Sequence, residues 1–303
     1  MTGQETSATA VPPEISNSWE LVEYIHPALL SLDYTQTRVK FAIIGASFAL
    51  WAVVFVLSAI VASATLTYQK LRLKEKIFWN LALVRASFGF FSMFVGAWAI
   101  FTHTEMDKDV VFGTTSTSHF ALLVTVGFFL FECGALTLSD IFFKSFSFLL
   151  NLHHWLSLVG YSLVIYIEAG HCFGCKGLIL EMSTPFSALC WTLLKAGKER
   201  SLLWKANQFL LVHAFHLRNV VECLFWYITY QNWTYIRENM PTPIFLALYV
   251  QLTLVSLIMT PYWTYKKTVQ MINPIDWNFE SQKRPRNMSY ANGNAETETK
   301  KEQ

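Results

Sequence analysis

Two adjacent histidines, His153 and His154, lie inside the apolar block 145–167 and are the residues of this sequence best suited to chemistry. Burial disfavours a charged imidazole, and the neutral ring can act as a nucleophile or as a general base. Consecutive residues of a helix point about 100° apart, so one ring can face a cavity while its neighbour meets a supporting group. The pair is therefore a candidate site for acyl transfer or ligand binding. The alternative is a pair of core histidines satisfied by hydrogen bonds.

Further ionisable residues stand in apolar stretches, where each is costly to bury and so marks a candidate site. Glu181 precedes Pro185, which should kink its helix. The Glu181 carboxyl is expected either to be protonated or to pair with Arg85 or Arg218. Arg218 can also pair with Glu222, because the two are four residues apart and share a helix face. We expect Glu181 and Arg218 to support a chamber that contains the histidine pair.

Two more histidines, His213 and His216, are three residues apart and are expected on one helix face, lining the same chamber. A di-iron centre would need more clustered histidines than the eight of this chain supply. Cys172 and Cys175 form a C-x-x-C in a predicted short loop, which is open to a disulfide or a metal site, but no second pair accompanies them. We therefore expect no metal site and no bound cofactor.

The elements that position these groups are predicted to be membrane-spanning helices. Hydrophobic residues make up 53% of the chain and charged residues 15%, below the ~25% charged residues of typical globular domains. A spanning helix needs about 20 mainly apolar residues, and seven blocks qualify: 39–65, 77–101, 119–139, 145–167, 177–194, 204–230 and 243–265. The sequence predicts an all-α polytopic membrane bundle, with six spans as the alternative if the fifth or sixth block is re-entrant. The net charge of +2 gives no case for nucleic-acid binding.

Basic residues predict the orientation of the bundle. They concentrate after the first, third, fifth and seventh blocks, which places these loops in the cytosol. Segment 1–38 lacks the features of a cleaved signal peptide and is expected in the lumen, as is the glycosylation sequon at Asn232. The tail 276–303 is then cytosolic, and Lys300 and Lys301 form a dilysine retrieval signal for coat proteins.

Several stretches resemble the TLC-domain family, which includes ceramide synthases and translocating-chain-associated proteins. They are the His153-His154 pair and segments 74–79, 180–186, 194–197, 204–208, 261–268 and 273–279. The resemblance implies a TLC domain over 70–275 and a helical barrel around a lipid chamber. In ceramide synthases the matching histidine pair lies in the acyl-transfer site. Their signature continues with carboxylates, whereas this chain has none between the pair and Glu168, which argues against acylation of a sphingoid base.

The resemblance also implies residence in the endoplasmic reticulum and the ER-Golgi intermediate compartment, and a role in lipid homeostasis. Three hypotheses follow. The first is a cargo receptor that carries newly made lysosomal hydrolases toward the Golgi, alone or as part of an oligomer. The second is an acyltransferase that uses His153 and His154, with acyl-CoA as co-substrate and a glycerophospholipid-type or sphingoid acceptor. The third is a lipid-binding or sensing protein, for example for ceramide, without turnover.

Overall fold

A computed structural model describes residues 20–276 and 279. In these residues the structure is helical without strands, and seven segments are long and apolar enough to cross a membrane. The segments are α2 (Thr37–Ser63), α4 (Leu73–Phe101), α6 (Ser116–Phe143), α7 (Phe148–Ile167), α8 to α9 (His171–Lys195), α10 (Leu202–Gln231) and α12 to α13 (Thr242–Ile272). The predicted all-α fold with seven spans is confirmed. The fifth and sixth blocks, on which the six-span alternative depended, are both long and apolar enough to span.

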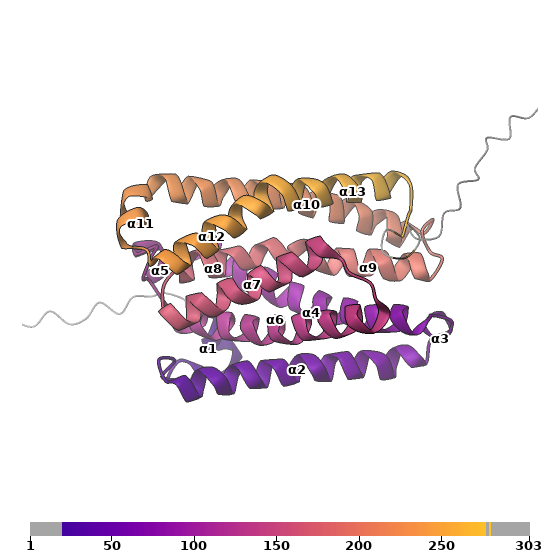
Figure 1. Ribbon diagram of the computed structural model, residues 1–303, viewed down its shortest axis with the longest axis horizontal. Helices are drawn as coiled ribbons and strands as arrows, with labels where there is room; N and C mark the ends of the chain where they lie inside the picture. Colours follow the sequence, from indigo (N-terminus) through magenta and orange to yellow (C-terminus); the bar gives the residue numbers. More distant parts are fainter. Residues whose placement is uncertain (1–19, 277–278, 280–303) are drawn as a thin grey trace, which may run out of the picture.

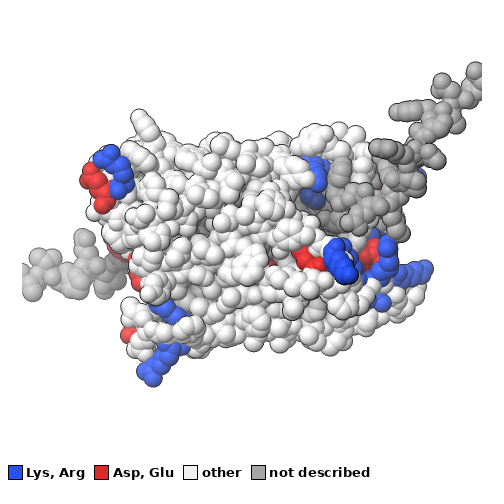
Figure 2. Space-filling model, viewed as in Figure 1, with Lys and Arg blue, Asp and Glu red and all other residues white. Residues whose placement is uncertain are grey.

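The spanning helices lie side by side with their long axes roughly aligned (Figure 1). Five short helices cap their ends: α1 (Leu21–Ile25), η1 (Pro27–Leu29), α3 (Leu66–Gln69), α5 (Glu105–Lys108) and α11 (Trp233–Asn239). Helices α1, α5 and α11 lie at the end predicted to face the lumen, and α3 lies at the other end. On the face shown in Figure 2, charged side chains lie mostly toward the two ends and leave a broad uncharged band between them. Such a band suits the interior of a bilayer.

Six of the seven spans close into a ring. Helix α6 packs on α7, α7 on α12, α13 on α10, α10 on α9, and α9 on α4, which returns to α6. Helix α2 lies outside the ring against α4 and α6. It is held by close packing: the Phe88 and Phe128 rings stack with their centroids 3.6 Å apart, and Trp51 of α2 meets both edge-on. The ring encloses the interior in which the predicted site residues can meet.

The fifth span is broken into α8 (His171–Gly177), the 3-10 helix η2 (Leu178–Ser183) and α9 (Thr184–Lys195). The break has a local cause, since Pro185 lies in the first turn of α9 and has no backbone N–H to continue a preceding helix. The predicted interruption is therefore confirmed. The predicted loop at Cys172 and Cys175 is wrong: both residues lie on α8, buried, with free thiols.

The seventh span also contains an irregular turn. Between α12 (Thr242–Leu254) and α13 (Thr260–Ile272) the backbone forms a π-helix, η3 (Val255–Met259), directly before Pro261. A π-turn shifts the helix face by inserting an extra residue, and such turns are frequent at functional sites. Here Val255, the first residue of this turn, and Gln251, one turn before it, face an internal cavity.

Helix α4 approaches η2 so closely that only glycine fits at one position. A Cβ at Gly96 would collide with the backbone of Ile179, whereas a Cβ at Gly134 of α6 would meet nothing within 4 Å. We expect Gly96→Ala to lower the free energy of unfolding by about 1–3 kcal/mol through overpacking. Gly134→Ala should be neutral or slightly stabilising. Thermal unfolding of the detergent-solubilised protein measures both; equal stability of the two variants would contradict the close packing.

Candidate functional site

Two cavities inside the helix ring meet at the predicted site. The inner cavity has a volume of about 110 Å³ and the outer one about 330 Å³. Phe129, His153, Glu181 and Arg218 line both. The structure therefore brings together three of the residues that the sequence singled out, from α7, η2 and α10.

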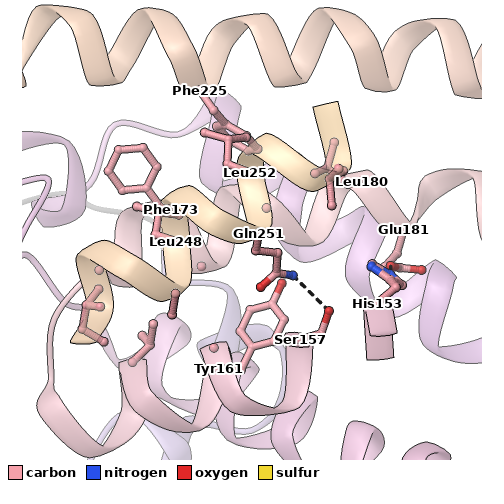
Figure 3. Close-up of a pocket in the computed structure, with 18 of the residues that line it drawn as sticks. His153, Ser157, Tyr161, Phe173, Leu180, Glu181, Phe225, Leu248, Gln251 and Leu252 are labelled. Atoms are coloured by element: carbon pink, nitrogen blue, oxygen red, sulfur yellow. Dashed lines mark hydrogen bonds and ion pairs between the residues drawn. The ribbon is translucent and has the colours of Figure 1, made fainter. Parts of the chain in front are cut away.

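The inner cavity is mostly apolar. Its walls carry Phe173 of α8, Phe225 of α10 and Leu248 of α12. Midway along them, Gln251 donates a hydrogen bond to the Ser157 hydroxyl, with donor and acceptor 3.0 Å apart (Figure 3). Its far end reaches Gly170, at the end of the bundle predicted to face the lumen. An elongated space with these walls suits an alkyl chain better than a polar ligand.

The outer cavity is more polar than the inner one, and its walls carry four cationic side chains and two carboxylates. Arg85, Lys266 and Lys267 line it together with Arg218, near the start of α7 and the last turns of α13. Guanidinium and ammonium groups gathered in one cavity favour an anionic ligand such as a phosphate. The site thus combines an apolar inner compartment with an outer compartment suited to anions.

The His153 ring lies at the junction of the two cavities. Its Nε2 is 3.4 Å from Oε1 of Glu181, whose other oxygen accepts a hydrogen bond of 2.6 Å from the Thr184 hydroxyl. The Trp263 ring meets His153 edge-on with centroids 5.6 Å apart. A carboxylate at Nε2 favours the tautomer with its proton there, which leaves Nδ1 as the basic nitrogen. Nδ1 is buried and has no hydrogen-bond partner among the described residues.

The neighbouring His154 has a different carboxylate. Its Nδ1 is 3.6 Å from Glu132 of α6, which forms an ion pair of 2.5 Å with Arg85 of α4. The sequence-based pairing of Arg85 with Glu181 is therefore wrong. Glu132 is an ionisable residue in the apolar block 119–139, but the sequence gives no sign of its partner, which lies 47 positions away.

The guanidinium of Arg218 is buried at the same junction, 3% exposed. Nη1 donates to the Ser183 hydroxyl at 3.3 Å, whereas Nε and Nη2 have no hydrogen-bond partner in the described part of the chain. The rings of Phe215 and Trp263 lie 5.3 and 5.7 Å from its central carbon. Arg218 therefore presents unused N–H donors to a ligand at the junction.

The predicted ion pair between Arg218 and Glu222 does not form between these described side chains. Glu222 instead accepts a hydrogen bond of 2.5 Å from Thr260, the first residue of α13. Spacing of four residues permits an intrahelical pair, but the packing of α13 on α10 offers Glu222 another donor.

Comparison with known proteins identifies the family of this chain. The profile of the TLC domain, shared by TRAM, LAG1 and CLN8 proteins, matches residues 78–268. The chain belongs to the TLC-domain family. It is 37% identical to Protein CLN8 of dog over 278 residues, 91% of this chain and 96% of that one. It is also 37% identical to human Protein CLN8 over 263 residues, 85% and 92% of the two chains. No solved structure matches it.

The TLC match begins in α4 and ends in α13, so it contains the six spans of the ring and omits α2. The packing of α2 outside the ring agrees with this limit. The domain limits expected from the sequence, 70–275 with a lumenal segment before the first span, stay predictions.

The prediction that His213 and His216 support the TLC chamber is wrong. Both are exposed on the outer face of α10, while Arg218 and Glu222 on the same helix point inward. The three-residue spacing correctly put the two histidines on one face, but it could not show which face the ring buries. The glycosylation candidate Asn232 ends α10, where its Nδ2 donates to the Ile228 carbonyl. Lys300 and Lys301 lie outside the described residues.

The Arg85–Glu132 pair generates a stability prediction. Glu132 is 0% exposed, and removal of one partner of a buried pair leaves a charge that costs about 3–5 kcal/mol. We expect Arg85→Leu to lower the free energy of unfolding by this amount. The double variant Arg85→Leu/Glu132→Leu should recover most of the loss, because no unpaired charge remains.

Chemical denaturation in mild detergent measures these differences. The exposed pair of Lys108 and Glu105 supplies the control, since Lys108→Ala should cost about 0–1 kcal/mol. A double variant as unstable as Arg85→Leu would show that burial of the unpaired carboxylate is not the cause.

Proposed function

We propose that this TLC-family chain is a membrane acyltransferase of the endoplasmic reticulum that moves an acyl group from acyl-CoA to a lipid alcohol. The observation that carries the proposal is the position of His153 between an apolar cavity and a cationic one. An acyl-CoA has the same division, with an apolar chain joined through a thioester to a polar, phosphorylated carrier.

The two compartments suggest how the co-substrate binds. The acyl chain lies in the inner cavity along Phe173, Phe225 and Leu248. The phosphates of the carrier meet Lys266 and Lys267 in the outer cavity. The thioester carbonyl then lies at the junction, within reach of His153 and Arg218. A bound and correctly oriented thioester removes much of the entropic cost of the reaction.

The proposed step is a direct transfer. Nδ1 of His153 takes the proton of the acceptor hydroxyl as its oxygen attacks the thioester carbonyl, and the carboxylate of Glu181 stabilises the resulting imidazolium. N–H groups of Arg218 donate to the oxyanion. The C–S bond then breaks, the acyl C–O bond remains, and the imidazolium returns its proton to the departing CoA thiolate. His154, beside Glu132, is the second candidate for the base.

The acceptor is proposed to be a glycerophospholipid-type alcohol rather than a sphingoid amine. The reason is the stretch after the histidine pair, which carries no carboxylate before Glu168 and so departs from the ceramide-synthase signature. An alcohol needs only one general base at the attacking oxygen, and His153 with Glu181 supplies it.

Removal of the histidines tests the transfer. With purified protein, acyl-CoA and a panel of lyso-lipid acceptors, we expect His153→Ala to lower turnover by about 10²–10⁴-fold, the usual contribution of a general base. His154→Ala should also lower it. The matched control is His213→Ala/His216→Ala, which removes two histidines from the exposed face of α10 and should leave turnover unchanged. Full activity of both site variants would refute the mechanism.

The same assay separates the enzyme from a lipid-binding protein without turnover. Glu181→Gln keeps the shape of the side chain but removes the charge that holds His153. An acyltransferase should lose turnover in this variant while it still binds an acyl-CoA analogue. Binding of lipid by all variants with no product on any acceptor would favour the ceramide-binding alternative.

We also propose a second role, as a receptor that cycles with newly made lysosomal hydrolases between the endoplasmic reticulum and the Golgi. The supporting observation is the pair Lys300 and Lys301 near the chain end, with a cytosolic tail as the basic residues predict. The helices α5 and α11 at the opposite end are short, so cargo would contact small surfaces or a second subunit.

The retrieval signal can be tested by location. Lys300→Ala/Lys301→Ala should move the protein from the endoplasmic reticulum to later compartments, because coat proteins read both lysines. Lys283→Ala/Arg284→Ala removes the same charge from the same tail and should leave the location unchanged. Microscopy against compartment markers measures this, and pull-down of lysosomal hydrolases tests the receptor role. An unchanged location of the first variant would remove the argument for cycling.

A further inference from the structure

A second cluster of ionisable side chains lies at the opposite end of the bundle from His153. It consists of His119 in the first turn of α6, Glu168 at the end of α7, and His171 at the start of α8. One ligand atom from each lies within 4.8 Å of the others. Nothing in the proposed acyl transfer uses these residues.

The two histidine–carboxylate contacts of this cluster lack the geometry of hydrogen bonds. Oε2 of Glu168 is 3.4 Å from Nδ1 of His119 and 3.6 Å from Nε2 of His171, longer than a good N–H···O bond. Both ring nitrogens are buried and have no hydrogen-bond partner among the described residues. Buried polar atoms are normally satisfied, so two such nitrogens aimed at one carboxylate oxygen indicate a missing ligand.

We infer that His119, Glu168 and His171 bind one divalent metal ion, which the chemistry of the ligands identifies as zinc. Two imidazoles and one carboxylate form a set that zinc uses in proteins, with a fourth position for water. Ligands at the usual zinc distances lie about 3.4 Å apart in a tetrahedron. The two His–Glu separations are close to that value. This site lies beyond the proposed function, and the inference differs from the expectation that the chain has no metal site.

Neighbouring groups hold each ligand in the orientation that a metal requires. The Ser118 hydroxyl forms a hydrogen bond of 2.9 Å with Nδ1 of His171, which leaves Nε2 of this ring for the ion. Tyr34 stacks on the His119 ring with centroids 5.5 Å apart. Lys40 pairs with Oε1 of Glu168, which leaves Oε2. Such outer partners fix tautomer and ring orientation at metal sites.

The backbone between α7 and α8 brings two of the ligands together. Glu168 has a left-handed conformation with φ 58°, and Gly170 follows with φ 81° and donates its N–H to the Val111 carbonyl at 2.7 Å. A left-handed non-glycine residue is uncommon and costs free energy unless its surroundings hold it there. A metal bound by Glu168 and His171 would stabilise this turn and join α6, α7 and α8.

Metal analysis of the full chain tests the inference. Protein purified in detergent without chelator should carry about one zinc per chain, and Co²⁺ added to zinc-free protein should give the visible absorption of a tetrahedral site. His119→Ala and Glu168→Gln should lose both signals. The control His213→Ala removes an exposed histidine and should keep them.

Folding of the variants is checked separately. Glu168→Gln is nearly isosteric, so its melting temperature can be compared with and without added Zn²⁺; the wild-type protein should be stabilised by the ion and this variant should not. Wild-type protein that neither carries zinc nor binds Co²⁺ would overturn the inference. So would zinc retained by folded His119→Ala and Glu168→Gln proteins. None of these readouts depends on acyl transfer.

Discussion

The structure depends on one constraint: an ionised group inside the helix ring must find its partner within the protein, because lipid supplies none. The Arg85–Glu132 pair meets this requirement between α4 and α6. In the first turn of α4, Glu75 pairs with Lys195 of α9 at 2.8 Å. Each pair joins helices that are neighbours in the ring, so charge pairing and ring order specify each other. A buried pair by itself adds little stability, so the effect of these pairs is mainly on which helices lie side by side.

The same constraint makes the two adjacent histidines unequal. His153 faces Glu181, whose second oxygen is held by Thr184, and it lines both cavities. His154 faces Glu132, a carboxylate already engaged by Arg85, and lines only the outer cavity. A carboxylate shared with a guanidinium is a weaker partner for an imidazolium than one bonded to a hydroxyl. Within the proposed transfer, this difference favours His153 over His154 as the general base.

The sequence predicted the elements well because spanning helices follow from long apolar blocks, and lipid permits little else. It predicted that Glu181 and Arg218 would join the histidine pair, since costly polar residues tend to gather. It failed where the answer depended on rotation about a helix axis. The spacing of His213 and His216 is the same whether their face is buried or exposed. It also failed to predict the partner of Arg85. That partner depends on α6 lying beside α4 in the ring, and no local sequence pattern predicts which helices are neighbours.

The cluster of His119, Glu168 and His171 was missed for a related reason. Its members lie near the ends of three helices, where ionisable residues are ordinary and carry no signal of function. The three side chains come together only because the backbone is left-handed at Glu168 and Gly170. Of the residue types in this stretch, only the glycine indicates such a turn. Gly170 also lines the far end of the inner cavity. The residues that would hold a metal therefore flank the residue that closes the apolar compartment. If that compartment holds an acyl chain, the position of Gly170 limits how long a chain the cavity accepts, and the proposed metal ligands then lie beside the end of the chain that is remote from His153.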